Sequence, residues 1–137
     1  MLSNSKNSYI TSQAELNHVV DLVRKKKLVA IDTEFTRQIT YYPILSIIQL
    51  AVKTADENVE LFIIDCLSNL DLSGFFEIIA DEKITKIFHS STQDLQIFYH
   101  QSRLMPKSVV DTQIMANFCG FDFNHPDLRR NFGIYTK

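Results

Sequence analysis

Two acidic residues, Asp32 and Glu34, lie two positions apart in an otherwise apolar segment. In a β-strand, residues i and i+2 point to the same face, and a rise of about 3.3 Å per residue separates their attachment points by ~7 Å. The two anions repel each other, whereas a bound divalent cation makes both favourable. The same spacing also fits an exposed strand end, so both interpretations stay open at this point.

Two further acids follow segments that we expect to be strands. Asp94 lies three residues after Ser91, which is capping-box spacing, and Asp111 suits the N-cap of the next helix. The ends of strands are also where α/β proteins gather functional groups, so Asp94 would approach Asp32 if their strands are neighbours. His89, beside these acids, is either a catalytic group or a hydrogen-bonded wall residue.

Other familiar catalytic arrangements are missing from the sequence. The four histidines and two cysteines show no His-x-x-His or Cys-x-x-Cys spacing, which disfavours zinc catalysis. Three glycines form neither a Gly-x-Gly-x-x-Gly motif nor a P-loop, and no serine lies in Gly-x-Ser-x-Gly. The remaining chemistry is hydrolysis by carboxylates and a hard cation. We expect Cys66 and Cys119 to be small core residues in a reducing compartment.

The elements that must position these residues follow an α/β order. Ser12 and Glu15 fit a capping box at the start of a helix over 12–26. Further helices are expected over 70–80, 91–101 and 111–118, and strands over 28–35, 44–52, 59–65 and 84–88, with a short extended piece at 109–110. Three early strands followed by alternating strands and helices predict a mixed sheet flanked by helices. Residues 1–10 are expected to be a flexible lead-in.

Length, composition and charge limit the function further. The 137 residues, 45% hydrophobic and 22% charged, predict one globular domain. Fourteen basic against 16 acidic residues give a net charge of −2, so a phosphate-bearing substrate would need local cations or bound metal. The first eight residues lack the apolar segment of a signal peptide, and no apolar run reaches the ~18 residues of a membrane span. The expected location is the cytoplasm.

Three blocks of sequence, in order, resemble the ribonuclease D family. The first is IDTEF at 31–35 with Arg37, TYYP at 40–43, Leu45 and IQL at 48–50. The second is KIFH at 86–89 followed by QDLQIF at 93–98, and the third is DTQIMA at 111–116 with Phe118 and Gly120. This family belongs to the DEDD group of 3′–5′ exonucleases, which have a ribonuclease H-like fold. The likeness covers about residues 10–123.

The resemblance implies a mechanism and a set of site residues. Asp32 and Glu34 would bind one Mg²⁺ or Mn²⁺ ion, and Asp94 would hold a second that Asp32 also reaches. Two such ions activate a water and stabilise the leaving oxygen, releasing nucleoside 5′-monophosphates from single-stranded RNA. The residues implied to bind substrate are Thr33 and Phe35, at the terminal nucleotide, with Arg37, Tyr41, His89 and Gln93.

Several alternatives remain for these substrate-binding residues. Phe35 could stack on a base of any sequence. Arg37 and Tyr41 could contact phosphates, or they could be ordinary loop and packing residues. The residue at the position of Asp111 is not one of the family's metal carboxylates, so we keep Asp111 as a helix cap.

The family's fourth carboxylate comes from a Tyr-x-x-x-Asp motif, which this sequence lacks. Tyr135 is followed by only two residues, and neither Asp122 nor Asp127 follows a tyrosine at that spacing. We therefore expect a partial exonuclease domain over 11–123, incomplete at its C-terminus, and an atypical tail over 124–137. The first metal would lack one ligand, and apolar sheet surface would be left exposed.

Three other functional interpretations follow from the missing carboxylate and from the fold class. The chain could be a catalytically inactive remnant that at most binds nucleic acid or metal. It could instead be one piece of a split enzyme, completed by another chain or an oligomer through its exposed core. A phospho-acceptor regulatory domain also carries acids at strand ends, but the three-strand opening and TYYP at 40–43 argue against it.

Overall fold

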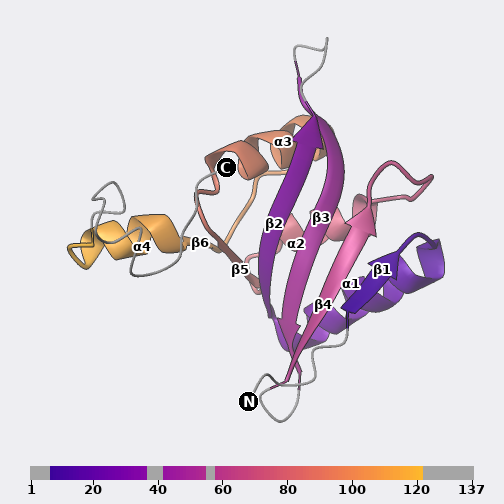
Figure 1. Ribbon diagram of the computed structural model, residues 1–137, viewed down its shortest axis with the longest axis horizontal. Coiled ribbons are helices and arrows are strands. Elements are labelled where there is room, and N and C mark those ends of the chain that lie inside the picture. The colour runs from indigo at the N-terminus through magenta and orange to yellow at the C-terminus, as the bar shows by residue number, and fades with distance from the viewer. Residues whose placement is uncertain (1–6, 37–41, 55–57, 122–137) are drawn as a thin grey trace.

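The computed structural model describes residues 7–36, 42–54 and 58–121. In this part of the chain six strands form one mixed sheet in the order β1-β4-β3-β2-β5-β6 (Figure 1). β2 pairs antiparallel with β3 and parallel with β5, β3 pairs antiparallel with β4, and the outer strands β1 and β6 pair parallel with their neighbours. The strands are β1 (Asn7–Ile10), β2 (Leu28–Thr36), β3 (Ile44–Lys53), β4 (Val59–Asp65), β5 (Thr85–Phe88) and β6 (Val109–Asp111).

Three helices lie behind this sheet, and a fourth projects from its edge (Figure 1). They are α1 (Gln13–Lys26), α2 (Ser73–Ala80), α3 (Thr92–Ser102) and α4 (Thr112–Phe118). α1 starts at the predicted capping box, in which Ser12 and Glu15 bond each other's backbone amides. None of the described helices is long and apolar enough to cross a membrane.

The core lies between the sheet and α1, α2 and α3. Alternate residues of β3, such as Ile48, Leu50 and Val52, are buried against these helices, as expected for a strand with one covered face. Burial of these side chains supplies the main drive for folding. The helices contribute Leu16, Val19, Val20, Val23, Phe75, Ile78, Ile79, Ile97 and Phe98. The predicted mixed sheet with helices against it is confirmed.

Two expectations from the sequence are wrong. Asn7–Ile10, expected within a flexible lead-in, forms β1, because its backbone pairs with Leu61–Ile64 of β4. Cys119 is exposed at the end of α4, since no residue of that helix is buried. Cys66 does pack against the core, and its burial raises the pKa of the thiol to about 12. The predicted tail over 124–137 lies outside the described residues.

Candidate active site

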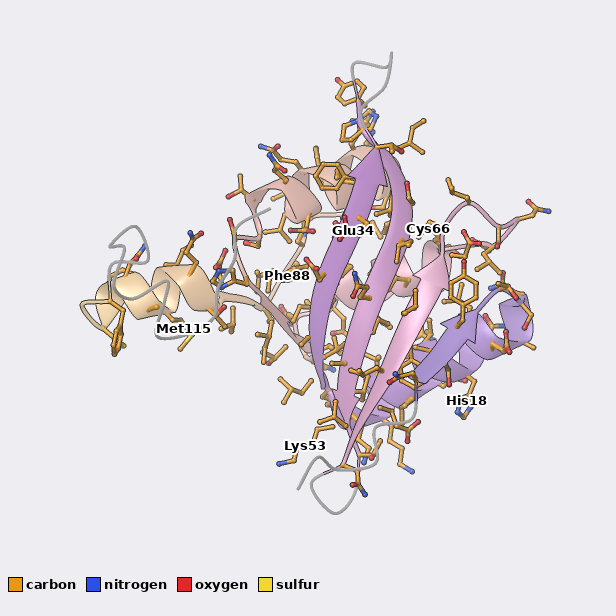
Figure 2. All side chains as sticks on the ribbon, viewed as in Figure 1. His18, Glu34, Lys53, Cys66, Phe88 and Met115 are labelled. Carbon is orange, nitrogen blue, oxygen red and sulfur yellow. The ribbon has the colours of Figure 1, made fainter. Side chains whose placement is uncertain are left out.

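Asp32 and Glu34 lie on β2, in the middle of the sheet (Figure 2 labels Glu34). Their partners across the β2–β3 ladder are Gln49 and Ile47, and all four side chains share one face of the sheet. In the described part of the chain, α1, α2 and α3 cover the opposite face. The two carboxylates are therefore presented together on the uncovered side of a central strand.

Thr33 lies between the two acids and points the other way, into the protein. It is buried, and its hydroxyl donates a short hydrogen bond to Asp94 Oδ1. Asp94 is itself buried in the first turn of α3, which follows β5, the parallel neighbour of β2. Asp94 thus lies next to the strand that carries Asp32, as predicted, but it contacts that strand through Thr33.

Burial raises the pKa of the Asp94 carboxyl, because its charged form is kept from water. The Thr33 hydroxyl and the Asp94 backbone amide act in the opposite direction by stabilising the anion, whereas the negative charges of Asp32 and Asp111 raise the pKa further. The Asp32 carboxylate is therefore close enough to act on Asp94, although Asp32 lies on the uncovered face of β2 and Asp94 lies on α3, at the covered side of the sheet.

Within residues 7–36, 42–54 and 58–121, no group of three or more His, Cys, Asp and Glu side chains could hold a metal ion. The donor chemistry of Asp32 and Glu34, two carboxylates on one face, fits a hard divalent cation. Asp94 forms no three-residue group with this pair; its Oδ1 accepts the Thr33 hydroxyl on the covered side of β2. The site therefore fits one cation held by the carboxylates of Asp32 and Glu34, with Asp94 behind them.

The alternative capping-box interpretation of Ser91 and Asp94 is wrong. The Ser91 side chain makes no cap hydrogen bond to α3; its hydroxyl donates to Asp111 Oδ2 at 2.8 Å. Asp111 also accepts the amides of Ser91 at 2.7 Å, Ser90 at 3.1 Å and Gln113 at 2.9 Å. Asp111 is thus the predicted N-cap of α4 and, in addition, a clamp on the turn between β5 and α3, which its sequence position alone did not indicate.

Hydrogen bonding explains the acidity of Asp111. Burial alone would raise the pKa of this carboxyl, but the amide and hydroxyl of Ser91, with the amides of Ser90 and Gln113, outweigh burial and lower the pKa to about 2. Asp111 therefore stays ionised, and its charge adds to that of Asp32 in raising the pKa of Asp94.

A groove of about 540 Å³, here called the sheet groove, runs over the uncovered face beside Asp32. Most of its lining is apolar, and it includes Ala30, Ala51, Leu61, Ile63 and Ile87. His89 lies at one end, where its Nδ1 is 2.9 Å from the hydroxyl of Thr112. His89 is thus hydrogen-bonded, as its interpretation as a wall residue expects, and its role toward a substrate stays a prediction.

A second cavity of about 560 Å³, here called the α3 pocket, lies between the start of β3 and the outer side of α3. Gln93, exposed in the turn that carries Asp94, lines this pocket rather than the sheet groove. Of the predicted substrate-binding residues, His89 lines the sheet groove and Gln93 the α3 pocket, whereas Thr33 is buried against Asp94. The sequence contains no periodic signal that would have separated them.

Phe35 faces the core side of β2, opposite Glu34. Its partner in β3 is Leu45, because the extra residue Ser46 forms a bulge that returns Leu45 to the buried face. The ring packs against the core and keeps part of its surface exposed, so base stacking remains a prediction. Arg37 and Tyr41 lie outside the described residues.

A mixed sheet with Asp-x-Glu on a central strand, and an aspartate on the helix after the neighbouring parallel strand, defines a class of nuclease domain with a ribonuclease H-like fold. The comparison with protein families agrees. The chain belongs to the 3′–5′ exonuclease family, whose sequence model matches residues 7–129.

Within this family the chain is similar to ribonuclease D. It is 38% identical to ribonuclease D of Nitrobacter hamburgensis over 113 residues, which are 82% of this chain and 28% of that protein. It is 39% identical to ribonuclease D of Escherichia coli over 111 residues, 81% of this chain and 28% of that protein. The chain thus spans about 28% of the length of these two curated relatives.

Solved structures give the same result. The crystal structure of Escherichia coli RNase D, an exoribonuclease, matches 98% of this chain and 35% of its own, with a TM-score of 0.73 and 33% identity. The catalytic core of RRP6 from Trypanosoma brucei matches 89% of this chain and 33% of its own, with a TM-score of 0.74 and 18% identity, which supports the fold alone. The predicted ribonuclease H-like fold class is confirmed.

Proposed function

We propose that this chain supplies catalytic acids for removing nucleotides from the 3′ end of single-stranded RNA. The observation that carries the proposal is the placement of Asp32 and Glu34 on one uncovered face of the central strand, with Asp94 directly behind them through Thr33. RNA is proposed because the relatives are named ribonuclease D, and because Trypanosoma brucei RNase D, a neighbour in fold, was solved in complex with RNA U12.

Asp32 and Glu34 would hold a divalent metal ion, Mg²⁺ or Mn²⁺. Such an ion supplies positive charge for the phosphodiester and lowers the pKa of a bound water. The chain's own contribution is geometric and electrostatic: the ladder to β3 fixes the spacing of the two acids, and the Thr33–Asp94 hydrogen bond fixes β2 against α3. A second ion would be held through Asp94, whose carboxylate can offer one oxygen while the other accepts the Thr33 hydroxyl.

The site also offers groups that could bind the substrate. Asp32 and His89 line the sheet groove, so a terminal nucleotide at the acids would lie against these side chains. Phe35, on the core side of β2, keeps part of its ring exposed, and stacking of a base on that exposed part stays proposed. Arg37 and Tyr41 remain proposed phosphate contacts, and the expected cytoplasmic location stays a prediction.

Trimming of a 5′-labelled single-stranded RNA in Mn²⁺ tests this function. The folded chain is expected to shorten the RNA from its 3′ end and release nucleoside 5′-monophosphates, and chelation or Asp32→Asn is expected to abolish the reaction. Asp21→Asn, which alters an exposed carboxylate of α1, is the matched control and should retain activity. Equal trimming by Asp32→Asn and the parent chain would contradict the proposal.

A second candidate is a catalytically inactive domain that at most binds metal or nucleic acid. It is favoured by the finding that the described residues gather no three metal-binding side chains. Calorimetry combined with the trimming assay separates the candidates: Mn²⁺ binding accompanied by Asp32-dependent trimming supports the enzyme, and Mn²⁺ binding without trimming supports the inactive domain. A complementing polypeptide that restores trimming when mixed with this chain would instead indicate a split enzyme.

A further inference from the structure

The α3 pocket has the composition of a site for a nucleotide rather than for an apolar ligand. Its lining includes Tyr42, Gln93, Gln96, Tyr99, His100 and Arg103, and no Asp or Glu among the described residues takes part. A volume of about 560 Å³ is within the usual range for ligand sites, roughly 300–1,000 Å³. In a chain with more acidic than basic residues, an acid-free pocket with a guanidinium is suited to an anion.

The side of α3 that faces the pocket is polar because its polar residues recur at helical spacing. Gln93, Gln96, His100 and Arg103 recur at three- and four-residue spacing and share one stripe, while Asp94 and Phe98 are buried on the other side. Only one lining residue of this helix, Ile97, is a buried apolar residue. The stripe therefore offers donors and acceptors to a ligand rather than a surface for core packing.

Aromatic rings form the other part of the site. Tyr42 stacks on His100 with ring centroids 3.6 Å apart and an interplanar angle of 15°. Tyr42 remains 51% exposed and Tyr99 43% exposed, so each ring presents surface to the pocket or solvent. Flat, exposed rings beside an Arg are the elements with which proteins bind single-stranded nucleic acid, by stacking on bases and pairing with phosphate.

The pocket also lies in a suitable direction from the catalytic acids. Gln93 borders it and is the neighbour of Asp94, and Arg103 is the C-cap of the same helix. The separation of ten positions between Gln93 and Arg103 corresponds to about 15 Å along the helix. Figure 1 shows α3 beside the end at which β2 finishes and β3 begins. The pocket thus starts next to Asp94 and extends away from it along α3.

We propose that the α3 pocket binds a nucleotide of single-stranded RNA on the 5′ side of the scissile bond, by stacking on Tyr99 and Tyr42 and by contact of Arg103 with phosphate. This inference rests on the proposed exonuclease function and extends it: the acids receive the 3′-terminal nucleotide, while α3 holds an upstream one. Affinity should therefore depend on RNA length.

Fluorescence anisotropy with 5′-labelled oligoadenylates of increasing length, in a chelator that prevents hydrolysis, tests the inference. The parent chain should bind more tightly with each added nucleotide until the pocket is filled. Tyr99→Ala and Arg103→Gln should each weaken binding of the longest oligomer about tenfold, or ~1.4 kcal/mol. Lys83→Gln, which removes an exposed cation before β5, is the matched control and should bind as the parent does.

If both α3 variants bind the longest oligomer as tightly as the parent, the inference is overturned. A second measurement needs no variant: RNA carrying one 4-thiouridine is photocrosslinked to the parent chain and the peptides are mapped. Crosslinks to Tyr42 or α3 from an internal position support the site, and crosslinks from that position confined to other elements overturn it. Because both experiments read binding without metal, their failure is distinguishable from failure of Asp32-dependent trimming.

Discussion

At the scale of single residues, the site depends on a buried carboxylate held by one hydroxyl. Thr33 and Asp94 are both buried, and the bond between them connects the central strand to α3. A buried acceptor that loses its donor keeps its desolvation cost, so this bond should matter more to stability than an exposed one. Thr33 is thus a positioning residue, placed between two acids that face the other way.

Thr33→Val tests this role while keeping the shape of the side chain. The variant leaves the Asp94 carboxylate without its hydroxyl donor, and we expect the free energy of unfolding to fall by about 1–3 kcal/mol. Thr36→Val, at the exposed end of the same strand, is the control and should change it little. Urea denaturation measures both, and equal stability of the two variants would argue against the positioning role.

Lys86 gives a pH-dependent prediction at the same scale. This side chain of β5 is fully buried, its Nζ donates to the Asp81 carbonyl at 2.6 Å, and burial lowers its pKa from 10.5 to about 8. Between these values the unfolded chain holds a proton that the folded chain has released. Stability from this group should therefore rise with pH from about 8 to 10.5, and the burial penalty is fully present below 8.

Lys86→Met should remove this rise. The free energy of unfolding of the parent should therefore increase relative to that of the variant as the pH increases. Urea titrations between neutral pH and about 10 measure the difference. Lys83→Met alters an exposed lysine of the preceding turn and should follow the parent at each pH. Curves for Lys86→Met and the parent that remain parallel would contradict the assigned cause.

At the scale of elements, Asp111 connects three pieces of backbone. It ends β6, caps α4 and holds the turn between β5 and α3, where Ser90 has a positive φ of 60°. That turn leads directly into the helix that carries Asp94. The clamp therefore acts on the site through the position of α3, without any contact of Asp111 with Thr33.

Asp111→Ala should reduce the free energy of unfolding by about 2 kcal/mol, since several buried amides lose a charged acceptor. The native pKa of about 2 lies below the ordinary 3.8, so this stabilisation is present above 3.8 and is lost as pH falls through 2. In thermal unfolding, the difference in stability between Asp111→Ala and the parent should decrease as the solution is made more acidic. Asp71→Asn, at an exposed carboxylate that accepts the Ser73 amide, is the control, and an equal loss there would contradict the clamp.

The elements also show what sequence patterns could and could not predict. α1 was predictable because its capping box and its apolar repeat are local. β1 was not, because four residues carry no period and become a strand only by pairing with β4. Ser91 and Asp94 have capping-box spacing, yet a distant residue, Asp111, takes the serine hydroxyl, and Thr33 takes the aspartate. The shared face of Asp32 and Glu34 was predictable because side chains of a strand alternate with a period of two residues.

At the scale of the whole molecule, the two faces of the sheet differ. α1, α2 and α3 cover one face, while the other carries Asp32, Glu34 and the sheet groove within the described part of the chain. α4 stands apart with Met115 and Phe118 exposed (Figure 2 labels Met115). Asp32 and Glu34 therefore lie on the open side, and the α3 pocket lies between α3 and the segment that leads into β3.

Paramagnetic broadening of backbone amide signals by Mn²⁺ tests the central claim, that the open face of β2 holds a divalent cation. We expect broadening to centre on residues 32–34 and to extend to 93–95 through the Thr33–Asp94 contact. Asp32→Asn should raise the apparent Kd at least tenfold, whereas Asp21→Asn should leave it unchanged. Broadening centred on other residues, or an unchanged Kd in Asp32→Asn, would contradict the account.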